Sequence, residues 1–324
     1  MSEPSGVAGQ VQHLAGAERP RIALLVPCLN ESLTIGKVID DFRAALPEAE
    51  IYVFDNNSTD DTARIARERG CVVFHEPRPG KGHVTQAMFR KVQADLFVMV
   101  DGDDTYSARD VRRLLEPVQS GRADMAVGTR LQEFSQGSFR ALHVFGNRVL
   151  TGIVNSIFQS RLSDMMSGYR AMSRELVCST PVLSSGFEVE TELTIRALEQ
   201  GFTILEVPLA YQERPAGSSS KLRTFRDGLR VMASIVNIFR SYKPFTFFGS
   251  IGLFFLVVGL GVGTVVILDY FDDRYVEHVP LAILATGCMI LSFFTFGIGI
   301  LLNTINERMR EIAYTQRSLV RGGR

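Results

Sequence analysis

The 324-residue sequence predicts an α/β domain with a mainly parallel sheet, followed by a hairpin of two membrane-spanning helices. In the first two thirds of the chain, short apolar runs typical of strands alternate with helical stretches, which is the pattern of a parallel sheet whose strands are joined by helices. In the last third, the apolar runs 245–268 and 279–302 contain no charged residue, and each exceeds the roughly 20 residues that cross a bilayer core. Basic residues flank this pair of runs, and the loop between them is acidic.

The strand-like runs lie at residues 21–27, 50–55, 71–76, 95–101 and 124–128. We expect Ser58 or Thr59 to cap the helix that follows the second run and stops at Gly70, and Ser107 to cap the helix that follows the fourth. Because ligands bind at the carboxyl ends of the strands in such sheets, functional residues are expected in the loops after these runs.

Polar side chains suited to a nucleotide follow the first three runs. The first run ends in PCLNES and the second in DNNSTDD, where short polar side chains can bond base and ribose groups. The third leads to RPGKG, a basic, glycine-containing loop that opens a helix and suits a diphosphate. The expected nucleotide-sugar ligands are Pro27, Asn30, Glu31, Asp55, Ser58, Asp60, Lys81 and Asp101. Each segment taken alone is also an ordinary cap or turn.

The fourth run delivers three carboxylates, Asp101, Asp103 and Asp104, within four residues at a strand end. Their mutual repulsion costs stability unless a cation or hydrogen-bond donors relieve it. Hard oxygen ligands suit Mg²⁺ or Mn²⁺, so Asp101 and Asp103 are expected to hold one of these ions. The alternative is a solvated acidic turn that caps the next helix.

Together these segments resemble family-2 glycosyltransferases of the GT-A fold, a Rossmann-like α/β domain. PCLNES, DNNSTDDT and VDGDDTY are similar to the P-x-x-N-E, D-x-S-x-D-x-T and D-x-D motifs of that family, SDMMSGYRAMSRE to its D-x-x-S-G-F-R segment, and RPAGSSSKL to its R-x-x-x-S-K segment. The two C-terminal spans narrow the resemblance to polyprenyl-phosphate sugar transferases of the dolichyl-phosphate mannose synthase and undecaprenyl-phosphate glucosyltransferase type. Thr105 stands where a Gln is common, so water or Asp104 would complete the metal shell, and Tyr169 replaces a common Phe.

The resemblance implies inverting, metal-dependent transfer of one hexose from a UDP- or GDP-sugar to a polyprenyl phosphate. The expected catalytic residues are Asp103, Asp164 and Arg130, with Asp164 either orienting the acceptor, accepting a proton from it or serving only as a turn residue. The acceptor phosphate is expected to meet Arg130, Arg140, Arg148, Arg214, Ser220 and Lys221, because guanidinium groups offer paired donors to phosphate. Each cation alone is as well explained as a solvated surface residue. Glu188 and Glu190 either bind the sugar or form the acidic first turn of a helix.

The flanking charges predict the topology. By the positive-inside rule, the basic flanks of the hairpin place the catalytic domain and both termini in the cytoplasm, at the cell membrane. The expected divisions are a flexible tail (1–20), the GT-A domain (21–222), an interfacial amphipathic helix (223–243), the hairpin (244–303) and a basic cytoplasmic tail (304–324). The amphipathic helix can instead pack on the domain core. An apolar helix over 139–160 is expected either to lie against the membrane beside the acceptor entrance or to pack in that core.

Composition removes several function classes. The 35 basic and 35 acidic residues cancel, which argues against a nucleic-acid partner, and the four cysteines lie too far apart for a zinc site or disulfide framework. The absence of Trp argues against a processive polysaccharide synthase of the same superfamily, whose acceptor motif contains Trp. A catalytically inert nucleotide-sugar binding subunit is the remaining alternative. The closely spaced Gly259, Gly261 and Gly263 permit helix contacts of the kind that form homo-oligomers.

Overall fold

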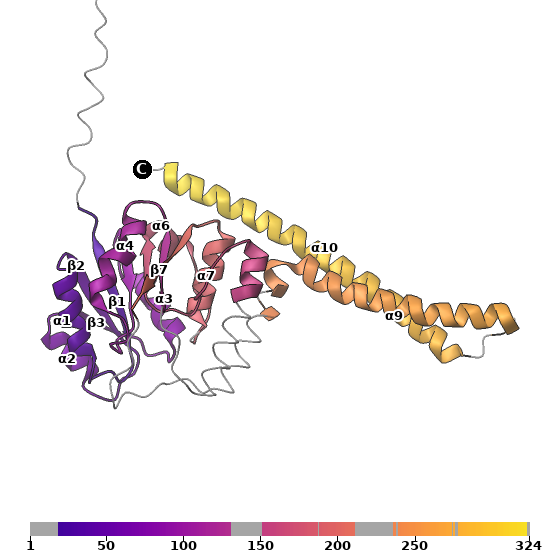
Figure 1. Ribbon diagram of the computed structural model, residues 1–324, viewed down its shortest axis with the longest axis horizontal. Helices are drawn as coiled ribbons and strands as arrows, with labels where there is room; N and C mark the ends of the chain where they lie inside the picture. Colours follow the sequence, from indigo (N-terminus) through magenta and orange to yellow (C-terminus); the bar gives the residue numbers. More distant parts are fainter. Residues whose placement is uncertain are drawn as a thin grey trace, which may run out of the picture. The chain divides into compact units, whose positions relative to one another are not determined.

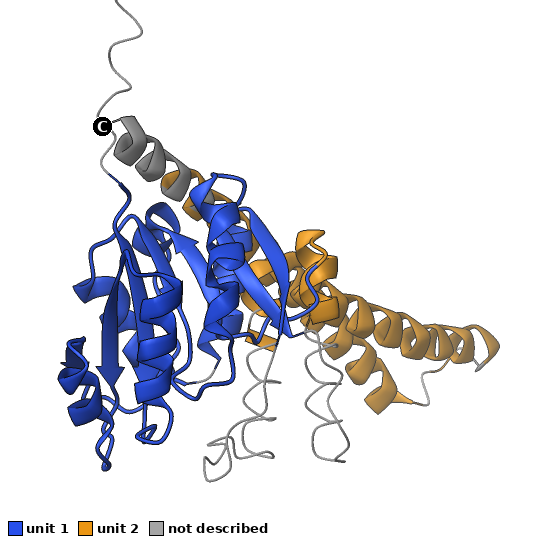
Figure 2. Ribbon diagram, turned by 60° about the vertical axis from the view of Figure 1, so that its left-hand side comes forward, with its two compact units in different colours: residues 1–135, 162–220 blue, residues 136–161, 221–324 orange. Residues whose placement is uncertain are grey.

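We analysed a computed structural model of the chain, which describes residues 19–130, 151–186, 188–210, 236–237, 239–273, 275 and 278–322, with side chains as far as Met309 and at Glu311 and Ile312. The chain divides into two compact units, residues 1–135 with 162–220 and residues 136–161 with 221–324 (Figure 2). The predicted domain divisions stay predictions. Arg140 and Arg148, then Arg214, Ser220 and Lys221, and most of the predicted amphipathic helix lie outside the described residues.

The first unit is an α/β domain (Figure 1). Its elements are β1 (Ile22–Cys28), α1 (Ile35–Ala45), β2 (Ala49–Asp55), α2 (Thr62–Glu68), β3 (Val72–His75), α3 (Lys81–Lys91), β4 (Leu96–Met99), the 3₁₀ helix η1 (Ala108–Asp110), α4 (Val111–Gln119), β5 (Met125–Arg130), β6 (Arg170–Ser173), α6 (Arg174–Ser179), α7 (Val189–Glu199) and β7 (Ile204–Leu209).

The strands form one seven-stranded sheet in the order β3-β2-β1-β4-β6-β5-β7. Neighbouring strands are parallel except at β6, which runs antiparallel to both β4 and β5. The predicted α/β domain with a mainly parallel sheet is confirmed. The strand-like runs that the sequence indicates correspond to β1 through β5, whereas β6 and β7 were not among them.

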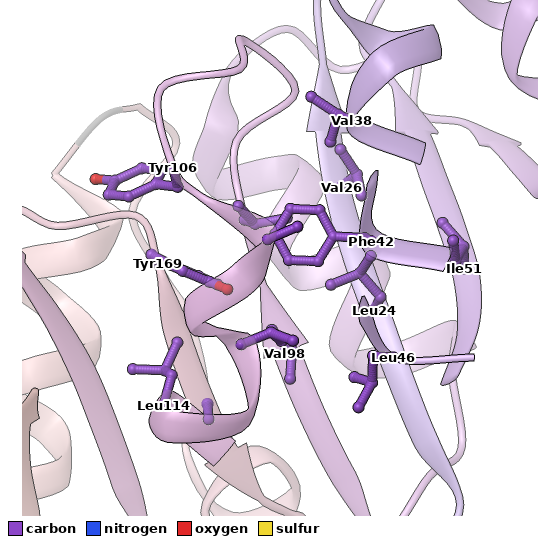
Figure 3. Close-up of a cluster of buried hydrophobic side chains, with 14 of the residues drawn as sticks. Leu24, Val26, Val38, Phe42, Leu46, Ile51, Val98, Tyr106, Leu114 and Tyr169 are labelled. Carbon is purple, nitrogen blue, oxygen red and sulfur yellow. The ribbon is translucent and has the colours of Figure 1, made fainter. Parts of the chain in front are cut away.

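Alternating residues of the buried strands feed two apolar layers, one on each face of the sheet. Leu24 and Val26 of β1 join a cluster with residues of α1, α2 and α4, part of which is drawn in Figure 3. Ala23 and Leu25 join a second cluster with residues of α3, α6 and α7. Successive side chains of a strand point to opposite faces of the sheet, so alternate residues enter different layers. Because both faces of β1 are covered, all of its residues are buried and the strand is apolar throughout.

The helix starts test the predicted caps. The Ser107 hydroxyl accepts a hydrogen bond from the backbone N–H of Arg109, as expected of a cap. The prediction for the second helix is wrong, because α2 begins only at Thr62 and neither Ser58 nor Thr59 caps it. Those two side chains and Asp60 bond the neighbouring loop instead, as described below. The helix ends before Gly70, whose φ of 71° is the left-handed conformation that glycine tolerates.

The second unit contains α9 (Pro244–Asp273) and α10 (Val279–Gly322), which pack against each other. Both helices are long and apolar enough to span a membrane, and only 11% and 17% of their most apolar windows is buried. A core helix of a soluble domain would bury most of this surface, so the exposed apolar faces favour a lipid surrounding. A Cβ atom at Gly259 would lie 3.2 Å from Cβ of Cys288, which places this glycine in the contact within the hairpin, whereas Gly261 faces open space.

Candidate active site

The candidate site lies at the carboxyl ends of β1, β2 and β4. The chain continues from β1 to β2 and β3 on one side, and β4 lies on the other side of β1, so the direction of winding reverses between β1 and β4. Ligands of open α/β sheets bind outside such a reversal point. The loops after β1 and β4 meet there: the Thr34 hydroxyl donates to the carbonyl of Gly102 at 2.7 Å, and a Cβ at Gly102 would lie 2.8 Å from Sγ of Cys28.

The loops after β1 and β2 are joined by reciprocal hydrogen bonds. The backbone N–H of Asn30 donates to the Ser58 hydroxyl at 2.9 Å, and the Thr59 N–H donates to the Asn30 side-chain oxygen at 2.7 Å. Asn30 adopts a φ of 53°, a left-handed conformation that Asn tolerates better than most residues. The predicted nucleotide ligands Asn30 and Ser58 therefore lie together, and each also holds the neighbouring loop.

Asp60 forms a second link between the same loops. Its carboxylate accepts hydrogen bonds from the N–H of Ser32 at 3.1 Å and from the Thr62 hydroxyl at 2.5 Å, and the Thr62 hydroxyl oxygen accepts from the N–H of Glu31 at 2.8 Å. Partial burial alone raises the pKa of Asp60, but these hydrogen bonds outweigh it and lower the pKa to about 2. Glu31 is 8% exposed and lies in this network. Pro27 is a buried β1 residue in register with Phe54.

Asn56, directly after the predicted ligand Asp55, positions the third loop. Its side-chain oxygen accepts from the N–H of Gly80 at 2.7 Å, and its amide donates to the carbonyls of Glu76 and Arg78 at 2.9 and 2.8 Å. Asp55 is 6% exposed and accepts from the Ser58 N–H at 3.3 Å. Asn56 is not among the residues predicted from the sequence, because a polar residue after a strand gives no hint of which distant carbonyls it will bond.

Lys81, at the start of α3, lies between two carboxylates. Its ammonium nitrogen is 2.5 Å from Oδ1 of Asp101 and 2.5 Å from Oε1 of Glu190, and the side chains are 11%, 26% and 6% exposed. Burial alone lowers the pKa of the Lys81 ammonium, but the charges of Asp101 and Glu190 outweigh it and raise the pKa, so Lys81 is a cation. The geometry assigns Glu190 to this cluster, whereas Glu188 accepts the N–H of Gly186 at 3.0 Å.

Glycine residues allow this cluster to form. A Cβ atom at Gly168 would lie 2.5 Å from Oδ2 of Asp101 and 3.1 Å from the Lys81 ammonium. A Cβ at Gly80 or Gly82 would collide with the carbonyl oxygen of Ser185 or Ser184. Close backbone approach at these three positions accounts for the glycines in the RPGKG and SDMMSGYR segments.

The remaining carboxylates of the acidic turn, residues 101–104, point to different partners. Oδ1 of Asp103, which is 4% exposed, accepts the Thr105 hydroxyl at 2.6 Å. Asp104 has a φ of 59° and receives the Lys37 ammonium on both oxygens at 2.7 and 2.8 Å. Lys37 thus relieves part of the repulsion in the turn, and the pairing argues against Asp104 as the residue that completes a metal shell.

The donor set of the turn fits a divalent cation of the hard class. Asp101 and Asp103 supply carboxylate oxygens two residues apart on one turn, and such oxygens suit Mg²⁺ or Mn²⁺. Within the described part of the chain, no group of three or more His, Cys, Asp or Glu side chains is placed to hold a metal. At this turn, the candidate ligands for a cation are the carboxylates of Asp101 and Asp103.

Arg130 and Asp164 form a bidentate ion pair. Nε of Arg130 is 2.6 Å from Oδ2 of Asp164, and its terminal nitrogen is 2.8 Å from Oδ1. Burial alone raises the pKa of Asp164, but Arg130 outweighs it and holds the pKa below its ordinary value, so the carboxylate is a weak base. Glu206 of β7 fixes the turn, because it accepts the N–H groups of Ser163 and Asp164 at 2.7 and 2.9 Å and the Ser163 hydroxyl at 2.7 Å.

Arg170 holds the segment between Asp164 and Gly168 through hydrogen bonds to its backbone carbonyls. Its guanidinium, which is fully buried, donates to the carbonyls of Met165 and Ser167 at 2.7 and 2.9 Å and to the Thr194 hydroxyl at 2.8 Å. The Gly168 N–H donates to the Tyr106 hydroxyl at 3.2 Å. The motif residue Arg170 therefore shapes the site from inside the domain.

The sequence is similar to known glycosyltransferases over most of its length. The family described as Glycosyl transferase family 2 matches residues 23–178. A glycosyltransferase of Haloferax volcanii named AglJ is 31% identical over 291 residues, which cover 90% of this chain and 95% of the relative. A dolichyl-phosphate hexose transferase of the same organism is 29% identical over 218 residues, which cover 67% of this chain and 93% of the relative.

Among solved structures, the fold resembles glucosyl-3-phosphoglycerate synthase from Mycobacterium tuberculosis, determined with Mn²⁺, uridine diphosphate and glucosyl-3-phosphoglycerate. The TM-score is 0.56 at 23% identity, and the match covers 69% of this chain and 80% of that chain. At this identity the likeness supports the GT-A fold alone.

Proposed function

Because the chain belongs to glycosyltransferase family 2, we propose that it transfers a single hexose from a UDP- or GDP-sugar to a polyprenyl phosphate at a membrane surface. The proposal rests on one combination within the chain: a charged site at the reversal point of a GT-A domain, and two helices with exposed apolar faces that suit a bilayer. The similarity to a dolichyl-phosphate hexose transferase supports the same acceptor class.

The proposed reaction needs little acid–base chemistry. An oxygen of the acceptor phosphate, which is already anionic at neutral pH, forms a bond to C1 of the sugar, while the bond from C1 to the nucleoside diphosphate breaks and the configuration inverts. The difficulty is to bring two anions together and to stabilise the leaving group. Lys81 supplies a fixed positive charge for the diphosphate, and Asp101 and Asp103 would hold Mg²⁺ or Mn²⁺. Such an ion, when bound, neutralises the leaving diphosphate.

We assign Arg130 to the acceptor side of the site. Its guanidinium is held in one orientation by the paired contacts to Asp164, and guanidinium groups bind phosphate oxygens well. Asp164 acts in this arrangement by orienting Arg130, because its lowered pKa makes it a poor proton acceptor. Arg140, Arg148, Arg214, Ser220 and Lys221 stay candidates for the same phosphate.

A transfer assay tests the proposal. Purified full-length protein is incubated with undecaprenyl phosphate, Mn²⁺ or Mg²⁺ and each member of a panel of radiolabelled UDP- and GDP-sugars. One donor should yield a chloroform-soluble lipid that carries a single sugar. A labelled polymer would favour the processive synthase, and nucleotide binding without any sugar lipid would favour the inert binding subunit.

We further propose that the α/β domain and both termini face the cytoplasm, which a cysteine-labelling experiment tests. Asp272→Cys places a thiol at the exposed end of α9, and the exposed Cys178 of the α/β domain serves as an internal control. An impermeant thiol reagent should label intact cells at position 272, whereas Cys178 should react only after permeabilisation. The reverse pattern would invert the proposed orientation.

A further inference from the structure

In the cluster of Lys81, Asp101 and Glu190, one enclosed ammonium contacts two carboxylates. Asp101 is a proposed metal ligand, yet its Oδ1 lies 2.5 Å from the Lys81 ammonium. A divalent cation on this carboxylate would repel Lys81, and the side chain is too enclosed, at 11% exposure, to escape into water at low cost. A second partner for Lys81 is therefore required whenever Asp101 binds a cation.

Glu190 is placed to be that partner. Its Oε1 lies 2.5 Å from the same ammonium, and at 6% exposure it is the most buried member of the cluster. Glu190 is a residue of the first turn of α7, whose Val189 and Leu193 are buried in the apolar layer beneath the sheet. The carboxylate thus belongs to a rigid element, in contrast to Asp101 on its turn.

The glycine at position 168 provides space beside Asp101 and Lys81. The Gly168 backbone lies so close that even a methyl group there would reach 2.5 Å from Oδ2 of Asp101 and 3.1 Å from the ammonium. A larger residue at position 168 would therefore displace the Asp101 carboxylate or the Lys81 ammonium. Lys81 can stay in this space when Asp101 turns away, because it already contacts Glu190.

We propose that Glu190 is a positioning residue that retains the Lys81 ammonium when Asp101 turns from Lys81 to a divalent cation. The exchange leaves the charge of the cluster balanced, because Glu190 neutralises Lys81 while the cation neutralises Asp101 and Asp103. Lys81 then stays beside the cation, where the leaving diphosphate would lie. This inference rests on the proposed function in its assignment of Asp101 as a metal ligand, but it concerns cation affinity and not the acceptor.

Cation binding measured without substrate tests the inference. Mn²⁺ affinity of the full-length protein is measured by electron paramagnetic resonance for the wild type, Glu190→Gln, and Glu190→Gln combined with Lys81→Met. Glu190→Gln should weaken Mn²⁺ binding by about tenfold or more, since Lys81 is left with Asp101 as its counter-ion and competes with the metal. The double variant should recover most of the lost affinity, because the competing ammonium is gone. Glu188→Gln, which removes the same charge from the same segment without touching Lys81, should leave Mn²⁺ affinity within about twofold of the wild type.

Two results from the Glu190 variants would overturn the inference. One is a Glu190→Gln variant with wild-type affinity for Mn²⁺. The other is a double variant as weak as Glu190→Gln, which would mean that Glu190 acts on the fold and not through Lys81. Wild-type protein that transfers sugar without binding Mn²⁺ would also overturn it while leaving the proposed function standing. Loss of Mn²⁺ affinity in Glu190→Gln with recovery in the double variant, in a protein that forms no sugar lipid, would support the inference and contradict the proposed function.

Discussion

The two halves of the carboxyl edge of the sheet are held together by different forces. On the β1–β2 half, which comprises the loops 29–34 and 56–61, side chains of Asn30, Ser58 and Asp60 bond the backbone of the neighbouring loop. On the β4–β6 half, which comprises the acidic turn with Lys81, Glu190 and the segment 164–169, the main contacts are ion pairs between enclosed side chains.

This difference indicates a division of labour. Side chains whose hydrogen bonds go to backbone N–H groups set the shape of a loop, and a bound ligand would compete with those bonds. Ion-paired side chains can exchange a protein partner for a charged ligand at a smaller net cost, because one opposite charge replaces another. We therefore expect substitutions on the β4–β6 half to change transfer. On the β1–β2 half, we expect Asp60, which the sequence predicts as a nucleotide ligand, to contribute mainly to stability, because its carboxylate already bonds Ser32 and Thr62.

The largest expected effect is that of Asp103→Ala. The substitution removes one of the two proposed metal ligands, and sugar transfer should fall by about a thousandfold or more, while the folded domain is retained. Turnover in the lipid-phosphate assay and thermal unfolding of the same sample measure the two quantities. Near-normal turnover would contradict the metal assignment.

Gly168→Ala should have the next largest effect. The new methyl group would meet Oδ2 of Asp101 at 2.5 Å and must displace either the carboxylate or the segment 164–169. A shift of this size in a catalytic group lowers transfer by about 10- to 100-fold. Gly152→Ala, at an exposed helical position with open space around it, is the matched control and should retain wild-type turnover.

Arg130→Lys tests the acceptor side of the β4–β6 half. Lysine keeps the positive charge but cannot form the paired contacts to Asp164 or present a fixed fork to phosphate, so transfer should fall by about tenfold, chiefly through KM for the lipid phosphate. Initial rates over a range of acceptor concentration separate KM from kcat. Unchanged kinetics would mean that Arg130 only supports the fold.

The smallest expected effect, on the β1–β2 half, is that of Asp60→Asn. The pKa of Asp60 is lowered from 3.8 to about 2 in the folded state, so the stability contributed by its ionised form is present above pH 3.8 and is lost as the pH falls towards 2. Asp60→Asn should reduce stability by about 1 kcal/mol at neutral pH, with turnover within about threefold of the wild type. The difference in Tm from the wild type should narrow between pH 5 and pH 3, and a difference that grows would contradict the assignment.

The first five strands of the sheet could be predicted from the sequence. Uninterrupted apolar runs bounded by turns are typical of buried parallel strands, and they indicate β1 to β5 correctly. β6 was missed because RAMS is short and contains a charged residue, Arg170, whose burial depends on carbonyls and a hydroxyl that only the folded segment supplies. The exposed apolar faces of α9 and α10 agree with the predicted hairpin, although α10 continues as a helix to Gly322 through the predicted tail.

The sequence indicates several residues of the site, but it does not indicate which of their side chains contact one another. The motifs indicate Asp101, Lys81 and Asp164, because Asp101 follows a strand, Lys81 opens a helix and Asp164 lies in a recognisable segment before β6. Lys81 lies between Asp101 and Glu190. Glu190 is more than 100 residues after Lys81 in the chain, and the two meet because α3 and α7 pack on one face of the sheet. No local pattern records a contact of this kind, and the same is true of Lys37 with Asp104.

Sugar-lipid formation by three purified proteins under one set of conditions tests the central claim most directly. With the active nucleotide sugar, undecaprenyl phosphate and Mn²⁺, the wild type and Asp60→Asn should form a lipid with a single sugar at similar rates, and Asp103→Ala should form essentially none. If Asp103→Ala matches the wild type while Asp60→Asn is inactive, or if the wild type forms no sugar lipid from any donor, the account is contradicted.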